Sequence, residues 1–176
     1  MQISSYQRVF NEYFAGEDYK NDAQKASAVL REARRVFFLG NGGSNAICSH
    51  MYEDFAKILR YQTFAFSDAA LITCFSNDYG YEKAMAEWLG IYGQAGDVLV
   101  AISSSGNSMN IVNAVEKANA LGMSAITLSG FKPDNKLRKL GHVNFYIPES
   151  DYGIVECFHQ VILHAILDDL ALERKE

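Results

Sequence analysis

The chain has 176 residues, of which 49% are hydrophobic and 21% are charged, and its formal net charge at pH 7 is −5. These values are typical of a single globular domain with one substantial core. The densest basic segment, residues 31–35, also contains Glu32 and gives no extended basic surface. We therefore expect no direct contact with nucleic acid.

The start of the chain has neither a basic segment nor a cleavage site typical of a signal peptide, and no window of about twenty residues is apolar throughout. We therefore expect a cytoplasmic protein without a membrane partner. The three cysteines are widely spaced and form no Cys-x-x-Cys motif. This pattern predicts buried free thiols, and it favours neither a disulfide framework nor a thiolate zinc site.

The spacing of apolar residues predicts helices and strands in alternation. A first amphipathic helix contains Tyr6–Phe14 and ends at Gly16. The later elements are expected in this order: helix 22–34, strand 36–39, helix 46–59, strand 62–66, two helices within 69–92, strand 97–102, helix 109–121, strand 124–128, a short helix within 135–140, strand 143–147 and helix 155–172. Short apolar strands that alternate with helices are typical of a buried parallel sheet. We predict an α/β fold, a three-layer sandwich around a five-stranded parallel sheet.

The predicted last helix is apolar around most of its circumference. Its apolar residues include Ile162, Leu163, Ala165, Ile166, Leu167, Leu170 and Ala171. A helix without a polar face lies either at the centre of a domain or against another subunit. Because the helices of an α/β domain lie outside its sheet, we expect this helix at a subunit interface in a homo-oligomer.

Ligands of such sheets bind beyond the carboxyl ends of the strands, so the loops after Leu39, Ile102 and Leu128 are the candidate sites. The first loop, Gly40–Ser44 (GNGGS), precedes a helix, and its glycines let backbone N–H groups approach an anion. It matches neither the Walker pattern nor the dinucleotide fingerprint. Alone, it is equally compatible with a plain tight turn.

The second loop, residues 103–108, carries four hydroxyls at the start of a helix, those of Ser103, Ser104, Ser105 and Ser108. We call it the serine loop. Hydroxyls at a helix N-terminus suit phosphate oxygens, and the lack of Lys or Arg argues against a nucleoside triphosphate. The loop therefore predicts a site for one phosphate monoester. The alternative is that one serine caps the helix and the others have no role.

Together these motifs resemble the sugar isomerase (SIS) domain. The resemblance covers residues 36–172 and is carried by GNGGS at 40–44, SNDYGY at 76–81, GDVLVAISSSGNS at 96–108 and a late helix with two histidines. It is closest to the phosphoheptose isomerases, which convert sedoheptulose 7-phosphate for bacterial surface polysaccharide. It implies one flavodoxin-like SIS domain over residues 1–176, with N-terminal helices in 1–34. It also implies a tetramer with active sites at subunit boundaries.

The resemblance implies roles for several further residues. Ser44 and the serine loop would bind phosphate together with Asn41 and Gly42, and Asp78 would contact sugar hydroxyls. The alternative for Asp78 is a helix or turn cap. His159 is expected to point away from the site and to be structural.

A metal and acid–base site is predicted on two helices. His50 and Asp54 are four residues apart and share a helix face, a spacing that also fits a plain surface pair. The resemblance implies that His50, Asp54, Glu156 and His164 bind one Zn²⁺ per subunit. It further implies that Asp54 and His164 are catalytic and that Glu156 also contacts substrate.

Some positions differ from the family pattern: Asp54 replaces a glutamate, Glu156 a glutamine and Gly153 an aspartate. We therefore expect an aldose–ketose isomerase with a metal-assisted enediol mechanism, with sedoheptulose 7-phosphate as the first candidate substrate. The alternatives are an isomerase of another ketose phosphate and a non-catalytic module that senses a sugar phosphate or binds a protein. Retention of His50, Asp54 and His164 favours the enzyme.

Overall fold

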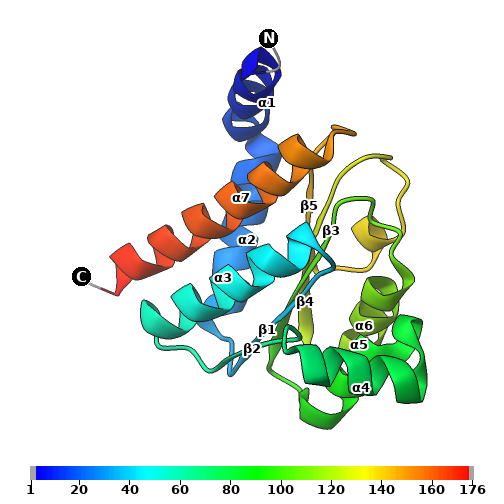
Figure 1. Cartoon of the computed structure of the whole chain (residues 1–176). Helices are drawn as coiled ribbons and strands as arrows, with labels where there is room; N and C mark the ends of the chain where they lie inside the picture. The colour runs from blue at the N-terminus through cyan, green and yellow to red at the C-terminus, as the bar shows by residue number, and fades with distance from the viewer. Residues whose placement is uncertain (1–2, 175–176) are drawn as a thin grey trace.

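The computed structural model describes residues 3–174, and Figure 1 shows how its elements are arranged. In chain order the elements are α1 (Ile3–Ala15), α2 (Glu17–Arg31), β1 (Val36–Leu39), α3 (Gly43–Lys57), β2 (Thr63–Ala65), α4 (Ala69–Tyr79), α5 (Tyr81–Tyr92), β3 (Val98–Ser103), α6 (Met109–Ala120), β4 (Ser124–Ser129), the 3₁₀ helix η1 (Leu137–Lys139), β5 (Val143–Tyr146) and α7 (Tyr152–Glu173). The predicted order of helices and strands is confirmed. The predicted single domain over residues 1–176 includes residues 1–2 and 175–176, which lie outside the described part.

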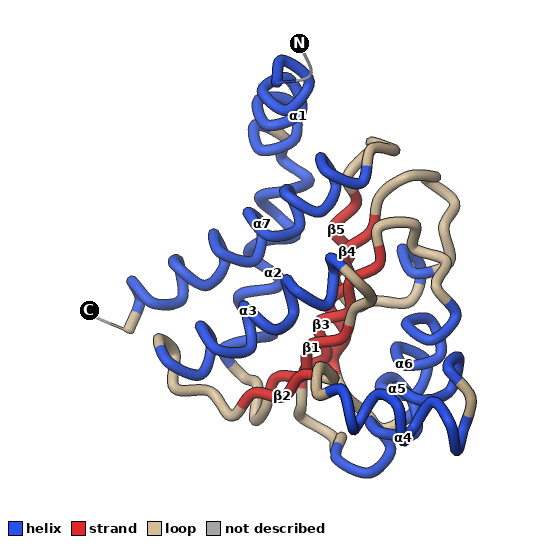
Figure 2. The backbone as a smooth tube through the Cα atoms, in the orientation of Figure 1, coloured by secondary structure: helices blue, strands red, loops and turns tan. Residues whose placement is uncertain are grey.

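The five strands form one parallel sheet in the order β2-β1-β3-β4-β5, visible in Figure 2. After β1 the chain adds β2 on one side, and it then returns to add β3 on the other side. The order therefore reverses between β1 and β3, where the carboxyl ends of the strands leave a crevice for ligands. The predicted α/β fold with five parallel strands is confirmed.

The central strands β1, β3 and β4 bury both of their faces, which explains their continuous apolar runs. In β1, Val36 and Phe38 join the core beneath α2, α3 and α7, whereas Phe37 and Leu39 join the core beneath α4, α5 and α6. Successive side chains of a strand point to opposite faces, so both faces of the sheet require a covering layer. Figure 1 shows these two helical layers, with α1 extending beyond them.

The apolar surface of α7 is covered largely by its own chain. Ile162, Leu163, Ile166, Leu167 and Leu170 are all buried, and α7 packs against α2 and α3. The reason that the sequence suggested for a subunit interface at this helix is therefore wrong. The prediction of a homo-oligomer itself remains untested.

Helices α2, α3 and α7 begin earlier than predicted, at Glu17, Gly43 and Tyr152 in place of residues 22, 46 and 155. Helix α2 begins at Glu17 because Gly16 is extended there, with φ −70° and ψ 141°, and Glu17 and Asp18 then complement the positive end of the helix. Helix α7 begins at Tyr152, after an extended Asp151. In α2 this short polar start lies outside the apolar pattern on which the prediction was based.

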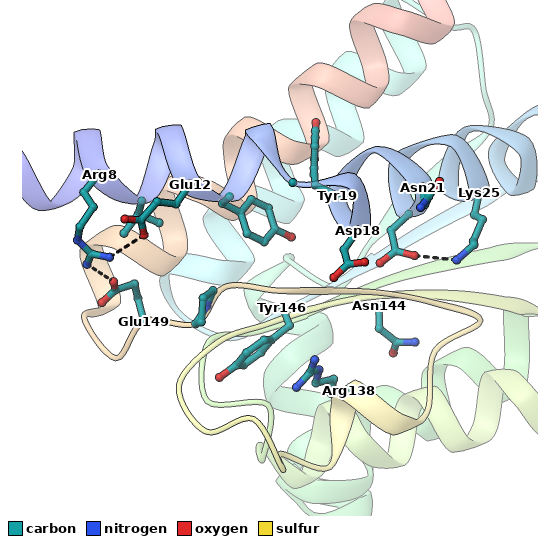
Figure 3. A pocket seen from close by; sticks show the side chains of 15 residues that line it. Arg8, Glu12, Asp18, Tyr19, Asn21, Lys25, Arg138, Asn144, Tyr146 and Glu149 are labelled. Atoms are coloured by element: carbon teal, nitrogen blue, oxygen red, sulfur yellow. Dashed lines mark hydrogen bonds and ion pairs between the residues drawn. The ribbon is translucent and has the colours of Figure 1, made fainter.

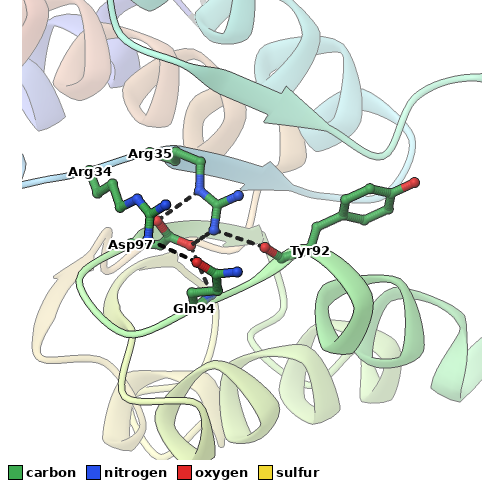
Figure 4. A network of polar contacts seen from close by, with 5 residues as sticks. All are labelled: Arg34, Arg35, Tyr92, Gln94 and Asp97. Atoms are coloured by element: carbon green, nitrogen blue, oxygen red, sulfur yellow. Dashed lines mark hydrogen bonds and ion pairs between the residues drawn. The ribbon is translucent and has the colours of Figure 1, made fainter.

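A buried ion pair joins β1 to β3 at the amino ends of the strands (Figure 4). Arg35 donates to both carboxylate oxygens of Asp97, at 3.0 and 2.6 Å, and Asp97 also accepts the N–H of Gln94. Asp97 is fully buried, and its charge is balanced by this bidentate pair. The network fixes the end of the sheet opposite the candidate ligand loops.

All three cysteines are free, but only Cys48 is buried, whereas Cys74 and Cys157 are exposed. The prediction of free thiols is confirmed, and the prediction that all of them are buried is wrong. Cys157 lies on the exposed side of α7, and Cys74 lies on α4, none of whose residues is buried. Within residues 3–174, no helix has both the length and the apolar content needed to cross a membrane.

Candidate functional site

The two candidate anion loops lie side by side. GNGGS follows β1 and the serine loop follows β3, and these neighbouring strands pair in parallel with Leu39 opposite Ala101. Helix α3 begins at Gly43, and Gly42 before it has φ +52° and ψ −120°, a conformation that favours glycine. The structure therefore brings together the two loops that the sequence singled out at the switch point of the sheet.

The serine loop carries a buried hydroxyl that lacks a partner. Ser103 and Ser104 are buried, and Ser103 Oγ donates to Ser108 Oγ at 3.1 Å. Ser105 Oγ accepts the backbone N–H of Asn107 at 3.3 Å. Ser104 Oγ has no hydrogen-bond partner within the described residues. Because an unpaired buried hydroxyl is costly, its presence supports a ligand with acceptor oxygens at this loop.

A buried asparagine, Asn135, supports the serine loop. Asn135 donates to Ser129 Oγ and to two backbone carbonyl oxygens. Gly106 has φ +65°, and a Cβ at this position would collide with the Asn135 amide. The N–H of Leu137 donates to the carbonyl of Gly106 at 2.9 Å. The loop is thus held in place before any ligand binds.

A second cluster joins α3 and α7. Asp54 Oδ2 lies 3.2 Å from His50 Nε2 and 3.9 Å from His164 Nδ1. The imidazole rings meet edge to face, with centroids 5.0 Å apart, and one donor atom from each of the three residues lies within 4.8 Å of the others. The side chain of Asp54 is 14% exposed and that of His50 is 49% exposed, so the cluster opens to solvent.

The two parts of the site are separated along α3. A helix rises about 1.5 Å per residue, which places His50 roughly 10 Å from Gly43 along the axis. The anion loops lie at the start of α3, and the His–Asp–His cluster lies farther along it. One end of a ligand would meet hydroxyls and backbone amides, and the other end would meet imidazole and carboxylate groups.

Glu156 lies apart from the His–Asp–His cluster. An ideal Cβ on Gly43 would lie 2.5 Å from Glu156 Oε2. The carboxylate therefore lies against Gly40–Ser44 at the start of α3, which we call the glycine turn. The group of potential metal ligands within residues 3–174 contains His50, Asp54 and His164 without Glu156. The favourable dipole at a helix N-terminus is one physical reason for this position.

Asp78 lies near the end of α4 and is exposed. Its carboxylate accepts from Asn77 Nδ2 at 2.9 Å, and Cys74 Sγ lies 3.8 Å away. The N-cap of α4 is Asp68, and its C-cap is Gly80. Asp78 therefore does not cap this helix, which removes the helix-cap alternative.

His159 is fully buried, as expected for a structural residue. Its Nε2 lies 3.2 Å from the carbonyl oxygen of Ser129, and burial lowers the pKa of the imidazole to about 4. The ring is therefore neutral at pH 7, and it supports the carboxyl end of β4. Within the described residues, His159 Nδ1 has no hydrogen-bond partner, so no hydrogen bond links this ring to the His–Asp–His cluster.

Sequence reasoning did not single out three polar residues near the loops: Asn110, Tyr81 and Asn135. Asn110 lies two residues after Ser108, and Tyr81 is the last residue of SNDYGY. Proximity to those motifs was the available signal. Asn135 lies outside every motif, and only the fold brings it to the serine loop.

A separate groove lies between α1–α2 and the edge of the sheet at β5 (Figure 3). It has a volume of about 480 Å³, and its lining contains none of the predicted site residues. Its charged groups are largely paired with one another, since Arg8 contacts Glu12 and Glu149, and Lys25 contacts Asp22. The Arg8–Glu149 pair joins α1 to the segment that follows β5.

Comparison with known proteins agrees with this geometry. The sequence model described as "SIS domain" matches residues 16–130. A phosphoheptose isomerase of Fusobacterium nucleatum is 35% identical over 178 residues, which cover 94% of this chain and 91% of that protein. The chain belongs to the SIS domain family. The phosphoheptose isomerase of Histophilus somni is 33% identical over 94% of this SIS domain protein and 90% of its own length.

Solved structures give the same result for the fold. The phosphoheptose isomerase of Neisseria gonorrhoeae superposes with a TM-score of 0.86 at 25% identity, over 96% of this SIS domain chain and 94% of that chain. Together with the curated relatives, this similarity places the protein among the aldose–ketose isomerases of the SIS family. The predicted family and enzyme class are confirmed.

Proposed function

We propose that this SIS domain protein converts sedoheptulose 7-phosphate to D-glycero-D-manno-heptose 7-phosphate. The observation that carries the proposal is the unpaired buried hydroxyl of Ser104 in the serine loop, on the chain that also holds the His–Asp–His cluster. The names of the relatives support a phosphorylated ketose as substrate.

The phosphate end would be held without a cationic side chain. Ser44, Ser103, Ser104, Ser105 and Ser108 supply hydroxyl donors, and the turn at Asn41 and Gly42 adds backbone N–H groups at the start of α3. Hydrogen bonds to a charged acceptor are about twice as strong as neutral ones. A dianionic phosphate therefore gains several such bonds together with the dipole of α3.

The His–Asp–His cluster fits one divalent metal ion. Two imidazoles and a carboxylate are a typical ligand set for catalytic zinc, which keeps a further position open. We propose Zn²⁺ at His50, Asp54 and His164, and Glu156 would complete the set after its side chain turns away from Gly43. When bound, the ion would polarise the sugar carbonyl.

The proton transfers fall to side chains of the cluster. Asp54 removes a proton from C1 of the ketose while His164 protonates O2, which gives the enediol. His164 then takes the proton from O1 as Asp54 returns a proton to C2, which gives the aldose. Asp54 would serve as a ligand and as a base, and His164 as a ligand and as an acid. Coordination to a metal lowers the basicity of Asp54 and requires an unprotonated ligating nitrogen on His164, so the two roles compete at both residues.

A panel of ketose phosphates tests this proposal. Purified protein is incubated with each sugar, with a chelator or with added Zn²⁺, and the aldose products are identified. Conversion of sedoheptulose 7-phosphate is the expected result. Conversion of another ketose phosphate instead would assign a different substrate, consistent with the replacements at Gly153 and Glu156. No conversion of any sugar would favour the sensor or protein-binding alternative.

A further inference from the structure

Three polar side chains from separate parts of the chain meet beneath the glycine turn. Asn41 belongs to the turn after β1, Asn110 to the first turn of α6, and Tyr81 is the first residue of α5. All three line a cavity of about 110 Å³ next to Gly42. Each of them lies in or next to one of the three motifs GNGGS, SNDYGY and SSSGNS.

The two asparagines form a reciprocal amide pair. Asn41 Nδ2 donates to Asn110 Oδ1 at 2.9 Å, and Asn110 Nδ2 donates to Asn41 Oδ1 at 2.7 Å. The hydroxyl of Tyr81 donates to the same Asn41 Oδ1 at 2.8 Å. Because a carbonyl oxygen has two lone pairs, Asn41 Oδ1 is fully occupied. Asn110 is 3% exposed, so the amide pair lies in a setting where an unmet donor or acceptor is costly.

These contacts link the turn to α5 and α6, whereas its own backbone hydrogen bonds lie within the start of α3. Gly42 has a positive φ and no side chain with which to cap α3. Across the turn, the N–H of Asn45 is shared between the carbonyls of Asn41 and Gly42, at 3.3 and 3.0 Å. The Asn41 side chain therefore ties the turn to α5 and α6.

The same tie reaches the serine loop. Helix α6 follows that loop directly, and the carbonyl of Ser108 accepts from both Ile111 and Val112, so Ser108 and Asn110 belong to one rigid first turn. A displacement of Asn110 against Asn41 would move the two anion loops relative to each other. A binding site needs its groups held to within about 0.5 Å of the productive geometry.

We propose that Asn110 and Tyr81 are positioning residues that hold the glycine turn against the serine loop, so that both loops contact one phosphate group. In this arrangement the side chain of Asn41 is committed to Asn110 and Tyr81. The turn then meets the phosphate through its backbone N–H groups. This inference rests on the proposed function, since it assumes a phosphate at these loops.

Two single variants and one control test the proposal. Asn110→Asp keeps the shape and the acceptor but loses the donor, and it places a carboxylate opposite Asn41 Oδ1. Tyr81→Phe removes only a hydroxyl from a residue that is 55% exposed, so the fold is retained. The control is Asn113→Asp on the same helix, because Asn113 Nδ2 donates to the backbone of α5 at Glu82 without contact with the turn.

The readouts are the dissociation constant for inorganic phosphate by calorimetry, the melting temperature, and KM and kcat for the sugar phosphate. We expect phosphate affinity to fall about ten-fold or more in Asn110→Asp and about three- to ten-fold in Tyr81→Phe, with KM rising in parallel. The double variant, Asn110→Asp with Tyr81→Phe, should lose less phosphate affinity than the product of the two single-variant losses, because both residues act on Asn41 Oδ1. The control should keep the phosphate affinity and KM of the wild type.

The outcomes separate this inference from the proposed function. If the wild type binds phosphate and both variants bind it within about two-fold of the wild type, the positioning role is wrong and the proposed function stands. The same holds if the variants lower only the melting temperature and kcat, as a purely structural defect would. If the wild type binds neither phosphate nor the sugar phosphate, both proposals are wrong.

Discussion

Asp54 is the residue on which the proposed chemistry depends most. Its Oδ2 faces both histidines of the cluster, and its side chain is the least exposed of the three. Asp54→Asn keeps the size but cannot accept a proton, so turnover should fall about 10²–10⁴-fold. Steady-state rates at saturating substrate, with and without added Zn²⁺, give the comparison.

The matched variant is Asp54→Glu, which restores the side chain of the family pattern. It should retain or raise activity, because the extra methylene gives the carboxylate the length of the family's glutamate side chain. If excess Zn²⁺ recovers most of the turnover of Asp54→Asn, Asp54 is a metal ligand and another group is the base. Wild-type turnover by Asp54→Asn without added metal would leave Asp54 with neither role.

Because the pKa of His159 is lowered in the folded state, we predict that the free energy of unfolding depends on pH. Burial lowers its folded-state pKa to about 4, whereas an unfolded histidine titrates near 6.5. Between these values the unfolded chain binds the extra proton. The contribution of the neutral His159 to the free energy of unfolding is therefore complete above pH 6.5. It is lost as the pH falls toward 4, by up to about 3 kcal/mol.

Urea unfolding at pH 7 and at pH 5, for the wild type and for His159→Gln, measures this effect. The wild type should lose more unfolding free energy than the variant over that interval, because glutamine does not titrate. An equal loss in both proteins would show that His159 does not drive the acid sensitivity.

The serine loop is the element that should determine phosphate affinity. Replacing Ser103 and Ser105 together with Ala removes two hydrogen bonds to a charged ligand, each worth about 1.5–3 kcal/mol. We expect a loss of sugar-phosphate affinity of at least a hundred-fold, measured by calorimetry, with little change in melting temperature. Ser124→Ala is the control, because Ser124 lies at the opposite end of the sheet in β4. Unchanged binding by the double variant would disprove the assignment of this loop.

The sequence was most informative about the strands and the loops that follow them. Runs such as residues 36–39 and 98–103 are buried on both faces, so their apolar pattern has one simple explanation. The parallel sheet then fixes where GNGGS and the serine loop lie. Helix starts were predicted less well, and in α2 the reason is that Glu17 begins the helix outside the apolar periodicity.

Contacts between side chains from distant segments could not be predicted. The pairing of Asn41 with Asn110 and the support from Asn135 depend on where loops meet after the sheet is formed. Glu156 was assigned to the metal from the family resemblance, and its helical spacing to His164 was compatible with that role. Spacing places a residue on a face but does not choose its rotamer, and the carboxylate lies against Gly43.

At the scale of the whole molecule, the single chain leaves apolar surface uncovered. Ile3 and Phe10 on α1 are 67% and 50% exposed, and Leu172 at the end of α7 is 62% exposed. Figure 1 shows α1 extending from the layers, where a second copy could cover it. We predict a homo-oligomer, with a tetramer expected. Sedimentation velocity at micromolar protein concentration measures its size. A stable monomer under those conditions would contradict this prediction.

The central claim is that one chain combines a phosphate anchor with an isomerase centre. The most direct test is the turnover of sedoheptulose 7-phosphate and of unphosphorylated sedoheptulose by the same Zn²⁺-supplemented protein. We predict an aldose product from the phosphate ester and a kcat/KM at least about a hundred-fold lower for the free sugar, because the free sugar lacks the hydrogen bonds to the serine loop. Equal kcat/KM values for the two sugars, or no aldose from the phosphate ester, would contradict the account.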